Sequence, residues 1–140
     1  MNICIINGPN LNLVGRRQPE IYGELYFEEY LEQLIKKYPK INLSYFQSNV
    51  EGELINHLQE NGFICDGIIL NAGAYTHTSV AIADCVSSIP AKVIEVHISN
   101  ILNREEFRHS SLVAKSCEGS IIGLGLKGYE LALKYFIELQ

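Results

Sequence analysis

The chain has few of the features that binding to nucleic acids, insertion into membranes or secretion would require. Its 11 lysines and arginines are outnumbered by 16 aspartates and glutamates, which gives a net charge of −5. Nucleic acids and anionic membranes attract a basic field, so this charge argues against both as partners. No apolar run approaches the roughly 20 residues of a membrane span. No basic segment precedes an apolar one at Met1–Cys4, which argues against a secretory signal peptide.

Cysteine is also scarce. The four cysteines form no C-x-x-C pair, and each lies in or beside an apolar segment: Cys4, Cys65, Cys85 and Cys117. This spacing favours buried, reduced thiols in a cytoplasmic protein. A catalytic cysteine is the alternative, but none of the four has an obvious neighbouring partner in the sequence.

Linkers, repeats and low-complexity segments are absent, so the 140 residues predict a single domain over 1–140. Apolar runs alternate with segments of helical periodicity. The predicted strands are Ile3–Ile6, Ile41–Phe46, Gly67–Leu70, Ala91–Val96 and Ser120–Ile122. The predicted helices are Phe27–Tyr38, Glu53–Asn61, Ser79–Ser88 and Lys127–Leu139. The alternation indicates an α/β fold with helices on both faces of a parallel sheet, and five strands suit the flavodoxin-like order 2-1-3-4-5.

The segment after the first strand, Asn7–Gly23, has no helical periodicity. A structureless stretch of this length in a compact domain is usually functional, and ligands of such sheets bind at the carboxyl ends of the strands. All four arginines lie in the loops after strands 1 and 4: Arg16, Arg17, Arg104 and Arg108. Because a guanidinium pairs two-pronged with carboxylate or phosphate, we predict an anion site there. The competing interpretation is that the arginines only balance neighbouring glutamates.

Two histidines also lie at the carboxyl ends of strands, since His77 comes after the third strand and His97 ends the fourth. Glu95 and His97 share one face of that strand, so the carboxylate can hold an imidazole nitrogen and set its tautomer or charge. The alternative is that both histidines are simply satisfied polar groups. No metal is predicted, because H-x-x-x-H and H-E-x-x-H spacings are absent and nearby arginines repel cations.

The segment Gly123–Gly128 matches the dinucleotide-binding pattern G-x-G-x-x-G. A dinucleotide site requires a following strand and an acidic residue about 20 positions on, and neither is present. We therefore predict that these glycines allow close packing of the last helix on the sheet.

Seven segments carry a family resemblance: Asn7–Asn12, Gly15–Gly23, Gln47–Gly52, Asn71–His77, Glu95–Asn100, Arg104–His109 and Gly123–Tyr129. In register over nearly the whole chain, they resemble type II 3-dehydroquinate dehydratases. The resemblance implies a flavodoxin-like fold and removal of water from 3-dehydroquinate to give 3-dehydroshikimate, a step of the shikimate pathway. It also implies no metal, cofactor or Schiff base, and a homo-oligomer of four trimers, a dodecamer.

The resemblance also implies a role for each site residue. Tyr22 is expected to be the base that takes a proton from C2, and Arg17 to favour its phenolate. Asn10 is expected to help hold the water that stabilises the enolate. His97, held by Glu95, is expected to protonate the departing hydroxyl. Substrate contacts are expected from Asn71, Gly73, His77, Ile98, Ser99 and Arg108, and from Asp84 of a neighbouring subunit.

Two positions depart from the family pattern: Ser110 follows His109 where a second histidine is frequent, and Val50 stands where histidine is common. The alternative hypothesis is a non-catalytic flavodoxin-like module that binds a small carboxylate or phosphate. That module explains the arginines but gives no reason for Tyr22, Glu95 and His97 to coexist. A metal-dependent hydrolase is a third hypothesis. Whether the pathway is biosynthetic or degrades quinate stays open.

Overall fold

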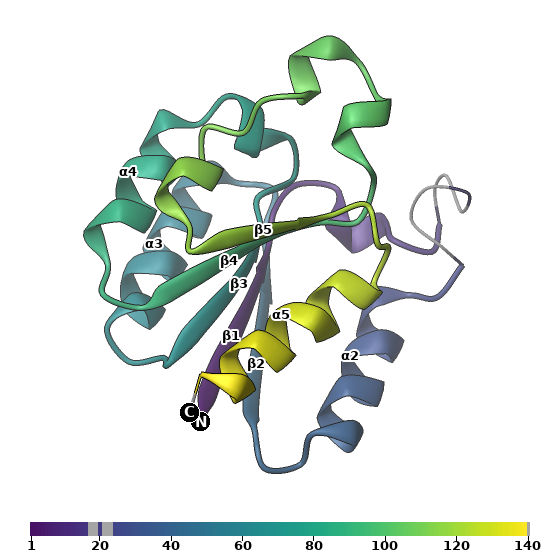
Figure 1. Ribbon diagram of the computed structural model, residues 1–140, viewed down its shortest axis with the longest axis vertical. Coiled ribbons are helices and arrows are strands. Elements are labelled where there is room, and N and C mark those ends of the chain that lie inside the picture. Colours follow the sequence, from purple (N-terminus) through teal and green to yellow (C-terminus); the bar gives the residue numbers. More distant parts are fainter. Residues whose placement is uncertain (17–19, 21–23, 140) are drawn as a thin grey trace.

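The computed structural model describes residues 1–16, 20 and 24–139. Its strands form one parallel sheet in the order β2-β1-β3-β4-β5 (Figure 1). They are β1 (Asn2–Asn7), β2 (Asn42–Gln47), β3 (Gly67–Asn71), β4 (Lys92–His97) and β5 (Gly119–Ile122). The longer helices are α2 (Phe27–Lys37), α3 (Glu51–Gly62), α4 (Val80–Ser88) and α5 (Lys127–Glu138). The predicted fold class and strand order are confirmed.

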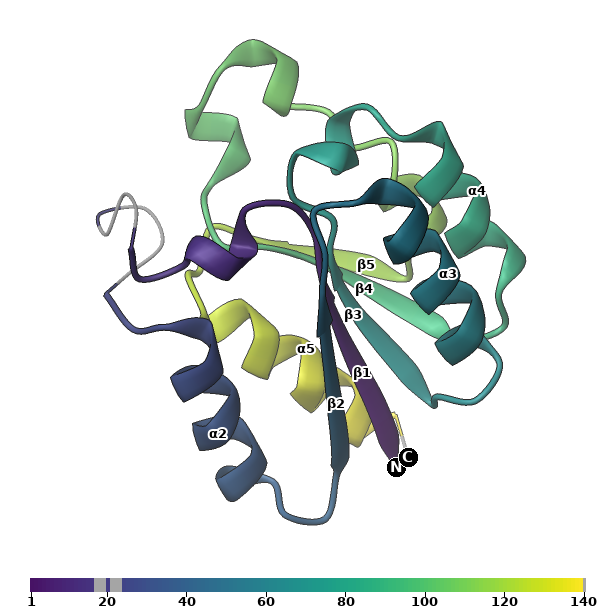
Figure 2. The same cartoon turned by 180° about the vertical axis from the view of Figure 1, so that it is seen from behind.

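Helices cover both faces of the sheet, with α2 and α5 on one side and α3 and α4 on the other (Figures 1 and 2). Strand β1 shows why its sequence is continuously apolar. Ile3 and Ile5 pack toward α2 and α5, whereas Cys4 and Ile6 pack toward α3 and α4. Side chains alternate along a strand, so a strand covered on both faces needs apolar residues at every position.

The ends of the elements differ from the prediction by one or two residues. Helix α3 begins at Glu51 rather than Glu53, because Glu51 and Gly52 carry no apolar side chain for periodicity to detect. Strands β3 and β4 each run one residue further than predicted, so that Asn71 and His97 are still strand residues. Both side chains are therefore held by the sheet rather than by a loop.

The glycines at and just before the start of α5 serve two purposes. A Cβ on Gly128 would lie 3.1 Å from Val96 Cγ1 and 3.4 Å from Ile121 Cγ2, which confirms the predicted close packing of helix on sheet. Packing does not explain Gly125, because no atom lies within 4 Å of the position that its Cβ would take. Its φ of +60° instead places it in the left-handed region that glycine tolerates best.

Short 3-10 helices gather at the carboxyl edge of the sheet, at the top of Figure 1. They are η1 (Leu11–Leu13), η2 (Gly73–His77), η3 (Ile101–Asn103) and η4 (Glu106–Arg108). A fifth, η5 (Ala114–Ser116), follows before β5. Within its described residues, the predicted structureless segment 7–23 thus includes the short helix η1. Among the described residues, no helix has both the length and the apolarity needed to cross a membrane.

Candidate active site

A cleft of about 670 Å³, partly open to solvent, lies at the carboxyl edge of the sheet. Its walls come from the loops after β1, β3 and β4, which are the three loops that the sequence singled out. The lining residues are Pro9, Asn10, Leu11, Val14, Asn71, Gly73, Ala74, His77, His97, Ile98, Ser99, Ile101, Arg104 and Arg108. Eight of the predicted site residues are among them.

Glycine and asparagine allow the first and third loops to meet. A Cβ on Gly8 would lie 2.4 Å from the carbonyl oxygen of Ala72, so only glycine fits there, and the Gly8 N–H donates to the Asn71 carbonyl at 2.7 Å. Asn10 has a φ of 68°, in the left-handed region that asparagine tolerates better than most residues. Its N–H donates to Asn49 Oδ1 at 3.0 Å, which ties the β1 loop to the start of α3.

Glu95 and His97 form a buried pair on β4. Oε1 of Glu95 lies 3.0 Å from Nε2 of His97, and the two side chains are 1% and 6% exposed. The contact is an ion pair when the imidazole is protonated. The predicted pairing of the two residues on one strand face is confirmed.

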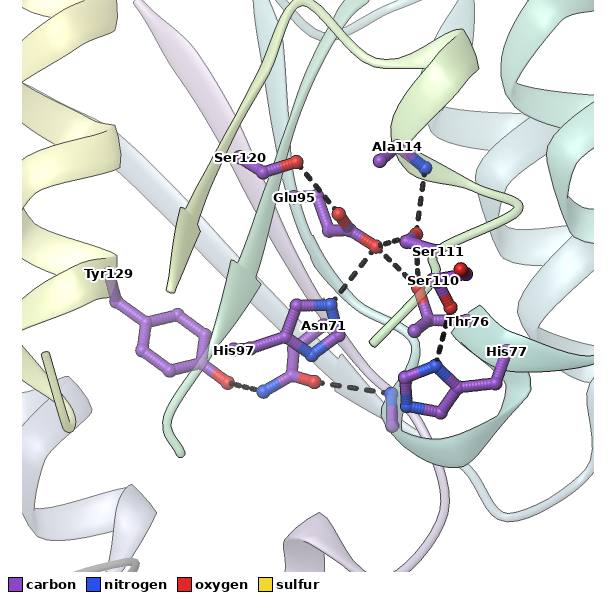
Figure 3. A network of polar contacts seen from close by, with 11 residues as sticks. Asn71, Thr76, His77, Glu95, His97, Ser110, Ser111, Ala114, Ser120 and Tyr129 are labelled. Carbon is purple, nitrogen blue, oxygen red and sulfur yellow. Dashed lines mark hydrogen bonds and ion pairs between the residues drawn. The ribbon is translucent and has the colours of Figure 1, made fainter. Parts of the chain in front are cut away.

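Three hydroxyls complete the surroundings of Glu95 (Figure 3). Thr76 and Ser111 donate to Oε1, the latter at 2.7 Å, and Ser120 donates to Oε2 at 2.7 Å. Burial alone would raise the pKa of this carboxyl, but the contact with His97 and the hydroxyl hydrogen bonds outweigh it and hold the pKa at about 2. Glu95 is therefore a carboxylate at neutral pH.

Sequence reasoning missed the three hydroxyls. They come from η2, from the loop after η4 and from β5, so no local pattern joins them. One signal was present: a glutamate inside an apolar strand must be satisfied by donors when it is buried. That signal predicts donors without saying which segments supply them.

His77 stands across the cleft from His97 and is held by the backbone. Its Nδ1 lies 2.8 Å from the carbonyl oxygen of Ser110. Because a carbonyl can only accept, Nδ1 carries a hydrogen, and Nε2 is the nitrogen left for other contacts. The two imidazole rings are nearly parallel, with centroids 6.3 Å apart and an interplanar angle of 17°.

The predicted anion site is represented in the cleft wall by Arg104 and Arg108. Arg108 Nε donates to Glu105 Oε2 at 2.7 Å, and Arg104 Nη1 donates to Ser99 Oγ at 3.4 Å. Arg108 thus lines the cleft, as the anion-site prediction requires, and also pairs with a glutamate, as the competing interpretation requires. Arg16 is different: its guanidinium lies 5.6 Å from the ring centroid of Tyr26 and is not part of the wall.

The observed cleft wall does not test the roles predicted for three site residues. Tyr22 and Arg17 lie outside the described residues. Asp84 is exposed on α4 and is not part of this chain's own cleft wall. Within residues 1–16, 20 and 24–139, no group of three or more histidines, cysteines, aspartates and glutamates is arranged to hold a metal ion.

Comparison with known proteins identifies the family. The family model described as dehydroquinase class II matches residues 1–137. The chain is 50% identical over 139 residues to a 3-dehydroquinate dehydratase of Exiguobacterium sp., covering 99% of this chain and 95% of that protein. It is 47% identical over 138 residues to a 3-dehydroquinate dehydratase of Bacillus pumilus, covering 97% and 94%.

A solved structure has a sequence identity to this chain in the same range. The crystal structure of a type II dehydroquinase from Butyrivibrio crossotus superimposes with a TM-score of 0.92 at 48% sequence identity, covering 98% of this chain and 97% of that one. Sequence and fold therefore show that the chain belongs to the dehydroquinase class II family, the type II 3-dehydroquinate dehydratases.

Proposed function

We propose that this chain removes water from 3-dehydroquinate to give 3-dehydroshikimate, without metal, cofactor or Schiff base. The observation that carries the proposal is the buried Glu95–His97 pair, placed in a cleft whose wall also holds Arg104 and Arg108. Elimination from an anionic substrate needs an acid for the leaving group and cations for the anion. Membership of the dehydroquinase class II family supports the same reaction.

We assign removal of the C2 proton to Tyr22, with Arg17 as the cation that favours its phenolate. This assignment rests on the family resemblance of the Gly15–Gly23 segment. A tyrosine has an ordinary pKa of about 10, so reaching a pKa near 7 requires about 4 kcal/mol of differential stabilisation. One close arginine lowers a pKa by roughly 1–3 units, so Arg17 supplies much of that requirement.

The remaining steps follow from the charge of the pair. Loss of the C2 proton leaves an enolate, and we assign its stabilisation to a water held by Asn10. As the C–O bond breaks, His97 gives a proton to the departing hydroxyl, so that water leaves and a conjugated enone remains. Glu95, with a pKa of about 2, stays negative and favours the imidazolium that this step needs. Transfer of the proton on Tyr22 back to His97 through solvent completes the cycle.

The atoms that face the cleft suggest how the substrate is bound. Nε2 of His97 faces Glu95, so we assign Nδ1 to the leaving group. We assign the substrate carboxylate and hydroxyls to the remaining predicted residues of the wall: Asn71, Gly73, His77, Ile98, Ser99 and Arg108. With its Nδ1 committed to a carbonyl, His77 offers Nε2 to this set.

We further propose a single domain over 1–140 that assembles as a dodecamer of four trimers and works in the cytoplasm. In the assembly, Asp84 is assigned to the substrate site of a neighbouring subunit, which suits its exposed position on α4. The cytoplasmic assignment is supported by the state of the cysteines, which are all free thiols.

The test is turnover of 3-dehydroquinate, followed by the ultraviolet absorbance of the enone product. We expect Tyr22→Phe to abolish turnover and to leave binding of the substrate within about tenfold, since one neutral hydrogen bond is worth about 1 kcal/mol. Near-normal activity in that variant would remove Tyr22 as the base. Absence of product with the unaltered protein would favour the binding-module hypothesis, and loss of activity in excess chelator would favour a metal-dependent enzyme.

A further inference from the structure

Behind the cleft, one hydroxyl joins the ends of β1 and β3. It belongs to Tyr129 on α5, whose side chain is fully buried. The ring packs edge-on against Phe27, with centroids 4.9 Å apart, and against Tyr30 at 6.4 Å. Burial raises the pKa of this phenol above its ordinary value, so the group is neutral and has one hydrogen to donate.

A backbone N–H sets the direction of every hydrogen bond in this network. The Gly73 N–H can only donate, and it donates to Oδ1 of Asn71 at 3.1 Å. Nδ2 of Asn71 therefore faces Tyr129 and donates to its hydroxyl oxygen at 2.8 Å (Figure 3). The phenol hydrogen is then left for Oδ1 of Asn7, also at 2.8 Å. The chain of donors runs in one direction from the η2 loop to β1.

The direction of these hydrogen bonds determines which atom of Asn71 is available to a ligand in the cleft that it lines. Its Oδ1 is occupied by Gly73, and one hydrogen of Nδ2 is occupied by Tyr129. The second hydrogen of Nδ2 is the donor that remains. The torsion that turns a carboxamide is broad and roughly two-fold, so rotamer preference alone does not hold this orientation. A reversed carboxamide would turn its NH2 group toward the Gly73 N–H and would compete with Asn7 for the phenol hydrogen, so Gly73 and Tyr129 together favour the observed orientation.

We propose that Tyr129 is a positioning residue for substrate binding, because its hydroxyl holds the Asn71 carboxamide so that an N–H faces an oxygen atom of the substrate. The proposal rests on the assignment of Asn71 to the substrate site made above. A donor at this place selects for substrate oxygens that accept, such as a hydroxyl or carboxylate oxygen of a polar ring compound.

Tyr30 provides a matched control within the same aromatic cluster. Its hydroxyl is also buried, and it lies near the Glu130 backbone rather than near Asn71. Tyr129→Phe and Tyr30→Phe therefore each remove one buried hydroxyl and keep the ring. Only the first removal takes a hydrogen-bond partner from a carboxamide on the cleft wall.

The experiment is steady-state kinetics with 3-dehydroquinate, with thermal unfolding of each variant as the check on folding. We expect Tyr129→Phe to raise KM about 5- to 20-fold with kcat within about threefold, as expected from loss of one or two hydrogen bonds. Tyr30→Phe should leave KM within about twofold, since no hydrogen bond to Asn71 is lost. In an Asn71→Ala background, Tyr129→Phe should add no further rise in KM, because it acts through Asn71.

Each contrary result has its own meaning. A KM in Tyr129→Phe equal to that in Tyr30→Phe, with KM raised in Asn71→Ala, overturns the inference and leaves the site assignment intact. An unchanged KM in Asn71→Ala removes Asn71 from the proposed site and the inference with it. Asn71→Asp tests the donor independently of Tyr129. It carries no N–H, so its KM should be at least that of Asn71→Ala, and a lower value overturns the proposed donor.

Discussion

Glu95 on β4 and Glu130 on α5 are both buried acidic side chains whose pKa is held at about 2. The means differ. Hydrogen bonds from Lys127 and Lys37, with Nζ–Oε distances of 2.6 and 2.8 Å, lower the pKa of Glu130, and Lys134 adds a third cation at 3.7 Å. For Glu95, burial opposes ionisation and is outweighed by His97 and neutral hydroxyls.

The two arrangements suit different purposes. Lysines stay charged at neutral pH, so the charge of Glu130 is permanently compensated, and the group connects α2 to α5. Lys37 and Tyr38, which donate to Glu130 from the end of α2, make that connection. Within the described residues, Glu95 instead forms its ion pair with His97, which carries a charge only when its imidazole is protonated. The hydroxyls bonded to Glu95 are neutral and do not compensate its negative charge, so that charge acts on His97.

The largest expected effect separates activity from stability. We expect Glu95→Gln to lower kcat by at least about 100-fold, since an amide cannot stabilise an imidazolium and general acid catalysis is worth 10²–10⁴. Glu130→Gln should keep kcat within about twofold but lower the free energy of unfolding by about 1–3 kcal/mol, as expected for charged hydrogen bonds. Steady-state kinetics and urea unfolding measure the two. Equal losses of activity in both variants would remove the distinction between the carboxylates.

An intermediate effect is expected in the pH dependence of stability. The pKa of Glu130 is lower in the folded chain, at about 2, than its ordinary value of 4.5. The folded state thus binds this proton less readily than the unfolded state, and the stabilisation is complete above pH 4.5 and lost as pH falls toward 2. The difference in unfolding free energy between the unaltered chain and Glu130→Gln should shrink across that window in urea titrations. A difference that stays constant from pH 6 to pH 2.5 would contradict the assignment.

The smallest effect is expected from a single hydroxyl of the Glu95 site. Ser120 makes the one hydrogen bond that Oε2 of Glu95 has within the described residues. We expect Ser120→Ala to raise the pKa of Glu95 and to lower kcat about 3- to 10-fold, which corresponds to about 1 kcal/mol. Ser87→Ala is the control, because the Ser87 hydroxyl is bonded to Ala83 and Ser116 at the surface. Equal kcat values for the two variants would mean that Thr76 and Ser111, which donate to Oε1, keep Glu95 ionised and in place without Ser120.

Much of the site could be predicted from local pattern. The Glu95–His97 pair followed from side-chain alternation on one strand, and it is observed at 3.0 Å. Asn71 and His77 could be placed near His97 because the carboxyl ends of parallel strands share one edge. Arg16 was grouped with the other arginines by its loop alone, and it packs on Tyr26 instead, because loop membership does not set the direction of a long side chain.

The hydrogen-bond partners could not be predicted in the same way. Thr76, Ser111 and Ser120 reach Glu95 from three separate segments, and Tyr129 reaches Asn71 across 58 positions in the sequence. Serine, threonine and tyrosine hydroxyls are common on any surface, so their presence in a sequence carries little information. Their meaning depends on burial and on which acceptor they meet.

The sequence by itself determined the order of strands and helices, the edge at which the loops gather, and the strand face shared by Glu95 and His97. These depend on apolar periodicity and on the alternation of side chains, which are local properties of the chain. Only the tertiary structure decided that Glu95 stays ionised and which way the Asn71 carboxamide faces. Both depend on donors from distant segments, because the direction of a hydrogen bond is a property of positions in space, which sequence spacing does not encode.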